Sequence, residues 1–272
     1  MNYSPFYPPK AVCFCFLLNL PKGLQLWLRL GLNWTFAQFK PALRQAAARC
    51  TQSYTNILQL EIMKFYLSSY KFGSEFLRLK DLLKQGSNIG YINNSRDWIG
   101  VNENNKHITF KEEKAFLEEL GFNCELLDLK QYFGKQESLK TKLDQLDGIW
   151  ICGGNTFVLR QAMKLSGFDS IFEELKERDD FVWSGYSAGI CILCDSLKYI
   201  TQVDDANNFP YNGITEVIYD GLGIFDFALL PHYKSNHEES ELIDKEVEKC
   251  IENNWKYRTL KDGEVIIFDN LK

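Results

Sequence analysis

From Met63 onward, short apolar runs alternate with amphipathic stretches. Continuous apolar runs are typical of strands buried on both faces, and apolar positions three and four apart are typical of helices. The pattern predicts strands at 63–70, 88–92, 124–129, 148–152, 181–183, 227–230, 259–260 and 265–268. It predicts helices at 76–83, 111–120, 139–146, 156–165, 171–178 and 238–252. This alternation indicates a three-layer α/β/α sandwich around a mostly parallel sheet. Asp262-Gly263, between the last two strands, predicts a hairpin turn.

The first 62 residues differ in composition from the rest of the chain. They hold five of the seven prolines, six basic residues and one acidic residue, in a chain of net charge −5. The apolar run Ala11 to Leu18 is too short to span a bilayer, and no small-residue cleavage site follows it promptly. Scarcity of acidic residues is also typical of an organellar transit peptide. We predict an N-terminal extension at 1–62, poorly ordered or not native, and a folded domain at 63–272 whose native start is near Met63.

Composition also limits the partners of the chain. The acidic net charge argues against nucleic acid as a partner, and no apolar run predicts a membrane span. The eight cysteines have neither the spacing of metal ligands nor that of a disulfide framework. We therefore expect buried, reduced thiols in a cytoplasmic protein that needs no cofactor and no metal.

The pentapeptide Gly185-Tyr186-Ser187-Ala188-Gly189 lies between two apolar runs. It has the form of a nucleophile elbow, in which a serine occupies a sharp turn between a strand and a helix. The glycines permit a strained backbone and close packing on the neighbouring elements. Backbone N–H groups at the start of the helix can stabilise an oxyanion beside the serine hydroxyl. The motif indicates a serine hydrolase, with an ordinary Gly-Ser turn as the alternative.

Two further predicted strands end in residues able to take part in the same chemistry. One ends in Gly153-Gly154-Asn155, which can supply a backbone N–H to an oxyanion hole, or can simply be a turn with Asn155 as a helix N-cap. The other ends in Pro231-His232. Because functional residues gather beyond the carboxyl ends of parallel strands, we expect these residues to share one cleft with Ser187.

A serine hydroxyl needs a neighbouring base, and the base needs an orienting acid. His232 is the candidate base, whereas His107 is expected in a loop and His237 on the solvated surface. His232 follows Ser187 by only 45 residues, which argues against the usual α/β-hydrolase arrangement. Sequence reasoning alone does not select the acid, and the candidates are Asp204, Asp205, Asp220, Asp226, Asp262, Glu264 and Asp269.

Four motifs, in this order, resemble the aspartyl dipeptidase (peptidase E) family of serine peptidases, to which cyanophycinase is related. They are Gly153-Gly154-Asn155-Thr156-Phe157, Gly185-Tyr186-Ser187-Ala188-Gly189, Gly221-Leu222-Gly223 and Pro231-His232-Tyr233. The resemblance covers roughly residues 63–270. It implies a fold like that of the class I glutamine amidotransferases (flavodoxin-like), with a serine where those enzymes carry a cysteine.

The resemblance also implies roles for particular residues. Ser187 would be the nucleophile and His232 the general base. The N–H groups of Gly154 and Ala188 would form the oxyanion hole. The third member of the triad would be an acid in the C-terminal segment, at Asp262. Its rivals are Glu264, Asp204 and Asp205.

The implied activity is hydrolysis of small peptides, including dipeptides with an N-terminal aspartate. An aspartate side chain needs a cationic partner in the pocket, for which Arg160, Lys234 and Arg258 are the candidates. Two alternatives remain open: an esterase-like serine hydrolase, and a non-catalytic amidotransferase-like binding protein. We expect a small peptide as the ligand and a monomer or homodimer as the assembly.

Overall fold

A computed structural model describes residues 63–98 and 100–269, and the predictions for residues 1–62 lie outside this range. The strands are β1 (Lys64–Ser68), β2 (Asn88–Ile92), β3 (Asn123–Leu126), β4 (Gly148–Ile151), β5 (Val182–Tyr186), β6 (Ala228–Leu230), β7 (Tyr257–Thr259) and β8 (Val265–Phe268). The α-helices are α4 (Leu79–Leu82), α5 (Glu103–Glu119), α6 (Gln136–Leu143), α7 (Thr156–Ser166), α8 (Phe168–Leu175), α9 (Ala188–Cys191) and α10 (Ser240–Glu252). The 3-10 helices are η1 (Phe76–Arg78), η2 (Asn94–Arg96), η3 (Leu129–Tyr132) and η4 (Leu197–Ile200).

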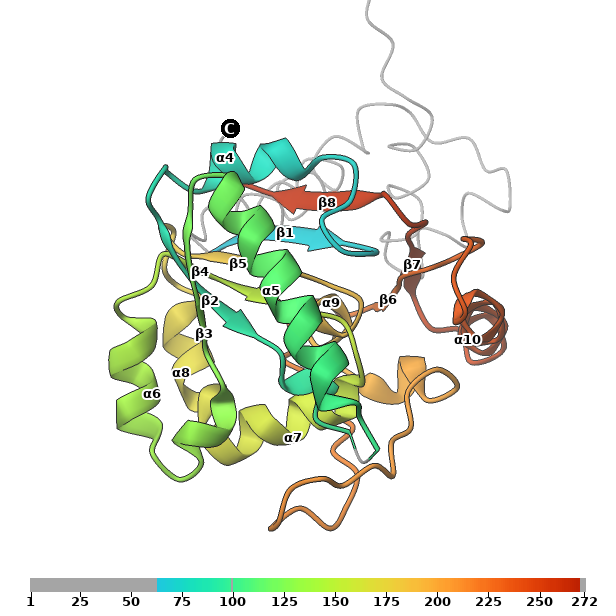
Figure 1. The fold of residues 1–272 in the computed structure, drawn as a ribbon. Helices are drawn as coiled ribbons and strands as arrows, with labels where there is room; N and C mark the ends of the chain where they lie inside the picture. Colours follow the sequence, from blue (N-terminus) through green and yellow to red (C-terminus); the bar gives the residue numbers. More distant parts are fainter. Residues whose placement is uncertain (1–62, 99, 270–272) are drawn as a thin grey trace, which may run out of the picture. The chain divides into compact units, whose positions relative to one another are not determined.

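The central sheet has six strands in the order β3-β2-β4-β5-β1-β8 (Figure 1). All neighbouring strands in it are parallel except β8, which runs antiparallel to β1. Strands β6 and β7 pair in parallel with each other in a separate two-stranded sheet. This architecture confirms the predicted α/β fold with a mostly parallel sheet.

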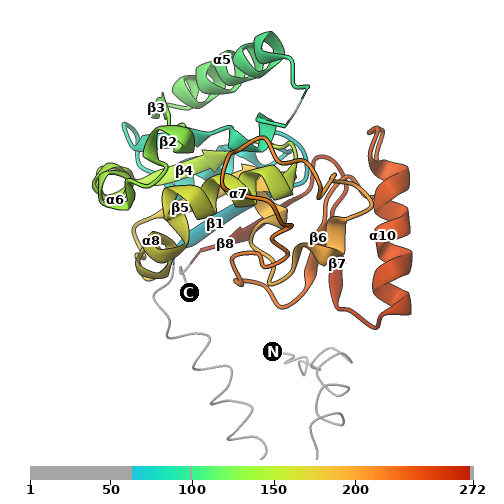
Figure 2. The same cartoon turned by 90° about the horizontal axis from the view of Figure 1, so that it is seen from below.

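Helices cover both faces of the central sheet (Figure 2). On β1, Phe65 and Leu67 join a core with α6, α7, α8 and α9, whereas Tyr66 joins a second core with α4 and α5. The alternation follows from the two-residue period of a strand. Because both faces are covered, the inner strands are largely apolar on both faces, which explains why continuous apolar runs predicted them correctly.

Helix α5 begins well before the predicted start at residue 111. The side chain of Asn102 accepts hydrogen bonds from the N–H groups of Asn104 and Asn105, at 3.0 and 3.3 Å, and so caps the helix. Most of the first two turns of α5 is polar and exposed, so these residues show no apolar stripe. The expectation that His107 lies in a loop is therefore wrong, since His107 is helical.

The hairpin predicted at Asp262-Gly263 does not form. β7 pairs with β6, while β8 pairs with β1 in the central sheet, so the two strands that flank Asp262 belong to different sheets. A turn signal in the sequence identifies the turn but not the partners of the strands on either side. The consequence is that Asp262 lies in a connection between the two sheets.

Candidate active site

Ser187 occupies the turn between β5 and α9 in a strained backbone conformation, with φ of 51° and ψ of −114°. The flanking glycines pack directly on β4. A Cβ atom at Gly189 would lie 2.5 Å from the carbonyl oxygen of Ile151, and a Cβ at Gly185 would collide with the same oxygen. The elbow therefore needs glycine at both positions for close packing rather than for flexibility.

We expect the Gly189→Ala substitution to destabilise the protein by about 1–3 kcal/mol, because the added methyl group overpacks this contact. The sign is informative, since alanine in an ordinary helix is more favourable than glycine by about 1 kcal/mol. Urea denaturation of the wild type and the variant measures the difference. An unchanged or larger free energy of unfolding in Gly189→Ala would contradict the collision with Ile151.

The backbone N–H groups of Gly154 and Ala188 lie beside the elbow, and neither has a hydrogen-bond partner among residues 63–98 and 100–269. Gly154 has φ of +149°, and a Cβ atom there would lie 2.5 Å from the carbonyl oxygen of Ser95. The next residue, Asn155, caps α7 by accepting a hydrogen bond from the N–H of Val158 at 2.9 Å. The turn therefore combines a helix cap with an available donor.

His232 follows β6 and is only 1% exposed. Its Nδ1 atom lies 2.7 Å from Oδ1 of Asp262, a hydrogen bond between an imidazole and a carboxylate. Ser69, just beyond β1, joins the two residues: its Oγ accepts the backbone N–H of His232 at 2.8 Å and lies 3.0 Å from Asp262 Oδ1. The N–H of Asp262 donates to Ser235 Oγ at 2.8 Å. These bonds fix the ring of His232 with Nε2 directed away from Asp262.

Ser187 follows β5 of the central sheet, whereas His232 follows β6 of the two-stranded sheet. The packing of α9 against β6 brings these two sheets together beside the elbow. Within the described part of the chain, the Ser187 hydroxyl makes no hydrogen bond, so a serine–histidine bond is not formed in this structure. In enzymes without a bound substrate such contacts are often long and tighten only in the substrate complex.

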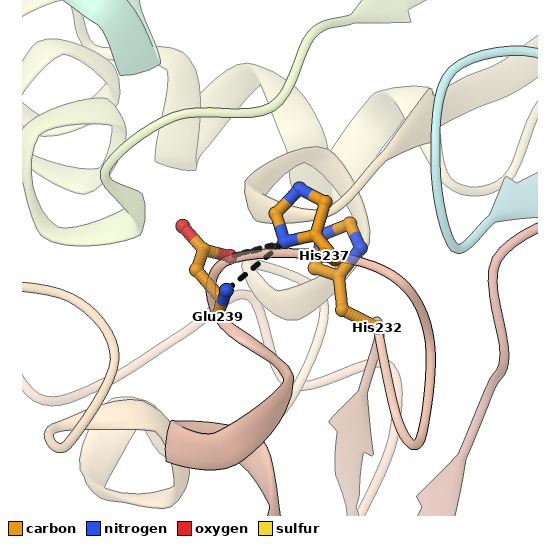
Figure 3. A group of neighbouring side chains, drawn as sticks. All are labelled: His232, His237 and Glu239. Atoms are coloured by element: carbon orange, nitrogen blue, oxygen red, sulfur yellow. Dashed lines mark hydrogen bonds and ion pairs between the residues drawn. The ribbon is translucent and has the colours of Figure 1, made fainter.

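Besides Asp262 and Ser69, two further side chains lie next to His232: those of His237 and Glu239 (Figure 3). The imidazole rings of His232 and His237 stack with centroids 3.7 Å apart and planes 9° from parallel. Glu239 Oε2 lies 3.7 Å from His232 Nε2, and burial raises the pKa of Glu239 to about 7, with Asp204 and other nearby acids adding to the shift. The expectation that His237 is a solvated surface residue is therefore wrong, since its side chain is 18% exposed and covers the ring of His232.

His232, His237 and Glu239 offer ligand atoms within 4.8 Å of one another, which makes them a group to test as a metal site. A metal ion must lie near the ring plane of each histidine that binds it. The two rings are stacked face to face, so their lone pairs do not converge on one point (Figure 3). In this arrangement the group does not form a metal centre, and one ring would have to turn before it could.

The rival acids make other contacts. Asp204 Oδ2 accepts the N–H of Thr156 at 2.9 Å, at the start of α7. Asp205 Oδ1 accepts the N–H of Asn207, and Glu264 Oε2 accepts the N–H of Lys261. Of the four acids weighed as the third triad member, Asp262 is therefore the one that hydrogen-bonds His232.

The three candidate cations for an aspartate pocket have different surroundings. Arg160 is buried and fully engaged, with a bidentate ion pair to Asp169 at 2.8 and 2.9 Å and a bond from Nε to the carbonyl oxygen of Asp220. Lys234 lies over the ring of Tyr233, and Arg258 is exposed on β7. The ion pair removes Arg160 from the candidates.

Sequence reasoning missed the part played by three residues beside His232: Ser69, His237 and Tyr70. Ser69 comes directly after the apolar strand β1, so the strand-end rule that selected His232 could also have selected it. His237 gave no comparable signal, because its approach to His232 depends on the path of the loop between them. Tyr70 contacts both histidine rings edge-on, with centroids 5.8 and 5.3 Å away.

A serine elbow together with a buried histidine–carboxylate pair beyond strand ends is the arrangement that α/β serine hydrolases use. Residues 98–272 match the sequence model of "Peptidase family S51", so the chain belongs to that family. This confirms the resemblance to the peptidase E family. The matched segment includes Ser187, His232 and Asp262.

Curated relatives share part of their length with this chain. The chain is 35% identical over 134 residues to "Uncharacterized peptidase Lmo0363" of Listeria monocytogenes serovar 1/2a, covering 48% of this chain and 61% of that protein. It is 33% identical over 123 residues to "Uncharacterized peptidase Lin0382" of Listeria innocua serovar 6a, covering 45% of this chain and 55% of that protein. The aligned region thus spans about three fifths of the length of these relatives.

Solved structures share the fold. The crystal structure of a protein from Listeria monocytogenes EGD-e, described as a "Putative Peptidase E Protein", superposes with a TM-score of 0.59 at 26% identity, over 76% of this chain and 98% of the other. A peptidase from an acI-B1 Actinobacterium superposes with a TM-score of 0.56 at 14% identity, over 76% and 84% of the two chains, which supports the fold alone. In the described part of the chain, none of the helices has the length and apolar character to cross a bilayer.

Proposed function

We propose that this protein is a serine peptidase that hydrolyses small peptides through Ser187, His232 and Asp262. The observation that carries the proposal is the 2.7 Å bond between His232 Nδ1 and Asp262, beyond the strand ends of a family S51 fold whose elbow holds Ser187. Hydrolysis through a serine nucleophile proceeds in two stages, acylation and deacylation.

In acylation, Nε2 of His232 takes the proton of the Ser187 hydroxyl as Oγ attacks the scissile carbonyl carbon. Asp262 accepts the N–H at Nδ1, which leaves Nε2 as the basic atom and stabilises the imidazolium that forms. The N–H groups of Gly154 and Ala188 receive the negative oxygen of the tetrahedral intermediate, and each donor contributes about 3 kcal/mol in comparable enzymes. The imidazolium then gives its proton to the leaving amine, and the peptide C–N bond breaks.

In deacylation, His232 takes a proton from water as the water attacks the acyl ester on Ser187. The second tetrahedral intermediate uses the same two N–H groups. When it collapses, His232 returns the proton to Oγ of Ser187 and a carboxylic acid leaves. No residue other than the three side chains and two amides is needed to balance the reaction.

As the substrate class we propose short peptides, with N-terminal aspartyl dipeptides as the first candidates. The test is a dipeptide library assayed with the purified protein beside a panel of simple esters. Preferential release of amino acids from dipeptides supports the proposal. Turnover of esters without any peptide turnover would favour the esterase alternative, and no turnover of either would favour a non-catalytic binding protein.

We expect the acid limb of the kcat/KM profile to have its midpoint below pH 6.5. Burial lowers the pKa of His232, the neighbouring His237 lowers it further, and Asp262 only partly opposes the shift. Since neutral imidazole is the active form, a lower pKa extends activity to lower pH. Other groups facing this ring are Tyr70 and Glu239.

The matched variant for this profile is His237→Gln. Removing the stacked ring of His237 removes its electrostatic effect on His232 and exposes His232 more to solvent. Both changes raise the pKa of His232, so the midpoint moves to higher pH. A midpoint above pH 6.5 in the wild type, or a downward shift in His237→Gln, would contradict this assignment.

We also propose a cytoplasmic location and an assembly no larger than a homodimer. Support for the first comes from the cysteines: the five in the described residues are free thiols and all are buried. Size-exclusion chromatography with light scattering tests the assembly.

A further inference from the structure

The residue before the nucleophile, Tyr186, holds a buried hydrogen bond on the face of the sheet covered by α5. Its phenol donates to Glu113 Oε1 at 2.6 Å. Glu113 lies in α5 and is 3% exposed. Its Oε2 atom accepts two further hydrogen bonds, from Tyr91 Oη at 2.8 Å and from Trp150 Nε1 at 3.1 Å. A buried carboxylate is costly unless it is hydrogen-bonded, and here three donors satisfy it. The hydrogen bond to Glu113 therefore holds the Tyr186 side chain in place on this face of the sheet.

The ring of Tyr186 also supports the turn that carries Gly154. A Cβ atom at Gly153 would lie 2.8 Å from Cε2 of Tyr186 and 3.0 Å from Cβ of Ser187. The turn at Gly153 therefore rests on both the tyrosine ring and the nucleophile. Any shift of Tyr186 would be passed to this turn, because the packing leaves no gap.

Arg96, in η2, holds the same turn from the other side. Its Nε donates to the carbonyl oxygen of Gly153 at 3.0 Å. This oxygen and the N–H of Gly154 belong to one peptide group, which is planar and trans. Fixing the oxygen therefore fixes the direction of the N–H, which points the opposite way. The charge of the guanidinium also polarises the peptide group, which makes its N–H a stronger donor.

The charge on Arg96 is retained in this partly buried position. Burial alone would lower the pKa of Arg96, but the groups around it, including the Glu113 carboxylate, raise it above its ordinary value. Glu113 thus serves both neighbours: it holds Tyr186 by a hydrogen bond and favours the charged form of Arg96.

We propose that Arg96 and Glu113 are positioning residues of the oxyanion hole: Arg96 directs the N–H of Gly154 through the carbonyl of Gly153, and Glu113 holds the elbow through Tyr186. Neither touches the substrate in this account. The inference rests on the serine-peptidase function proposed above. The activity of Ser187→Ala distinguishes a failure of this inference from a failure of the proposed function.

The first test compares two buried phenols on the same carboxylate. Tyr186→Phe and Tyr91→Phe each remove one hydrogen bond to Glu113, but only Tyr186 belongs to the elbow. We expect both to lose similar thermal stability. We expect Tyr186→Phe to lower kcat by about tenfold, a fraction of the loss on removing an oxyanion donor, and Tyr91→Phe to keep the wild-type kcat.

The second test uses Arg96→Ala and Arg96→Lys, with the thermal melt of each to confirm folding. Misdirecting one oxyanion donor should lower kcat by about 10–100-fold with KM little changed. Binding of a peptide boronate, which mimics the tetrahedral intermediate, should weaken by the same factor. Added ethylguanidinium should restore part of the activity of Arg96→Ala, which a purely structural loss would not allow.

Suppose that Ser187→Ala is inactive, as the proposed function requires. Equal kcat values in Tyr186→Phe and Tyr91→Phe, or an effect of Arg96→Ala on KM alone, would then overturn the proposal for Arg96 and Glu113. If a folded Ser187→Ala variant hydrolyses peptides as the wild type does, the proposed function fails instead, and the two failures are thereby distinguished.

Discussion

Ser187→Ala is expected to lower kcat for peptide hydrolysis by about 10⁴-fold or more, as loss of the nucleophile does in other serine peptidases. Alanine removes the only atom that can form the acyl-enzyme, while the oxyanion hole and the binding groups stay in place. The variant should therefore still bind peptide with a similar Kd. Steady-state kinetics and isothermal titration of a peptide measure the two quantities.

The control for Ser187→Ala is Ser184→Ala, in β5, the strand that leads into the elbow. The Ser184 hydroxyl is buried and donates to the carbonyl oxygen of Ile149, so its loss should cost about 1 kcal/mol of stability and leave the chemistry intact. A serine-directed phosphonate should label the wild type and Ser184→Ala but not Ser187→Ala. Wild-type turnover by a folded Ser187→Ala variant would remove the proposed mechanism.

Asp262→Asn is expected to lower kcat by about 10⁴-fold, by analogy with the corresponding change in another serine peptidase. The amide can donate to Nδ1 of His232, which favours the tautomer with the proton on Nε2. That tautomer cannot accept the proton of Ser187. Because the size of the side chain is preserved, the thermal stability should change much less than the rate.

Glu264→Gln and Asp204→Asn are the matched controls for the triad acid. Both replace a carboxylate by an amide, and in this structure both side chains contact backbone N–H groups rather than His232. Both variants should keep kcat close to the wild-type value. A loss in Asp204→Asn as large as that expected for Asp262→Asn would transfer the role of the acid to Asp204.

The sequence predicted the central strands well because the structure buries them on both faces. It also predicted the positions of Ser187 and His232, since strand ends, glycines and an isolated histidine are local signals. The resemblance to a family then singled out Asp262 from seven acids. Local signals in the sequence therefore predicted where each strand ends and at which edge of the sheet these ends lie.

The remaining features depend on contacts between distant segments. The apolar run 227–230 predicted β6, but nothing in it showed that β6 would leave the central sheet and pair with β7. Glu113 looks like an ordinary polar position in a helix, and its burial follows only from the tyrosines and tryptophan that surround it. Likewise, the stacking of His237 on His232 depends on the loop between them.

The direction of β8 determines where in the sequence the proposed catalytic acid, Asp262, can occur. In a parallel strand, the residues after its end reach the active-site edge. β8 is antiparallel, with Val265 opposite Ser68 of β1, so the residues before its start reach that edge instead. His232 and Asp262 are each tied to Ser69 at the same edge. The segment between them, which includes α10 and β7, is therefore joined to this edge of the central sheet at both of its ends through Ser69.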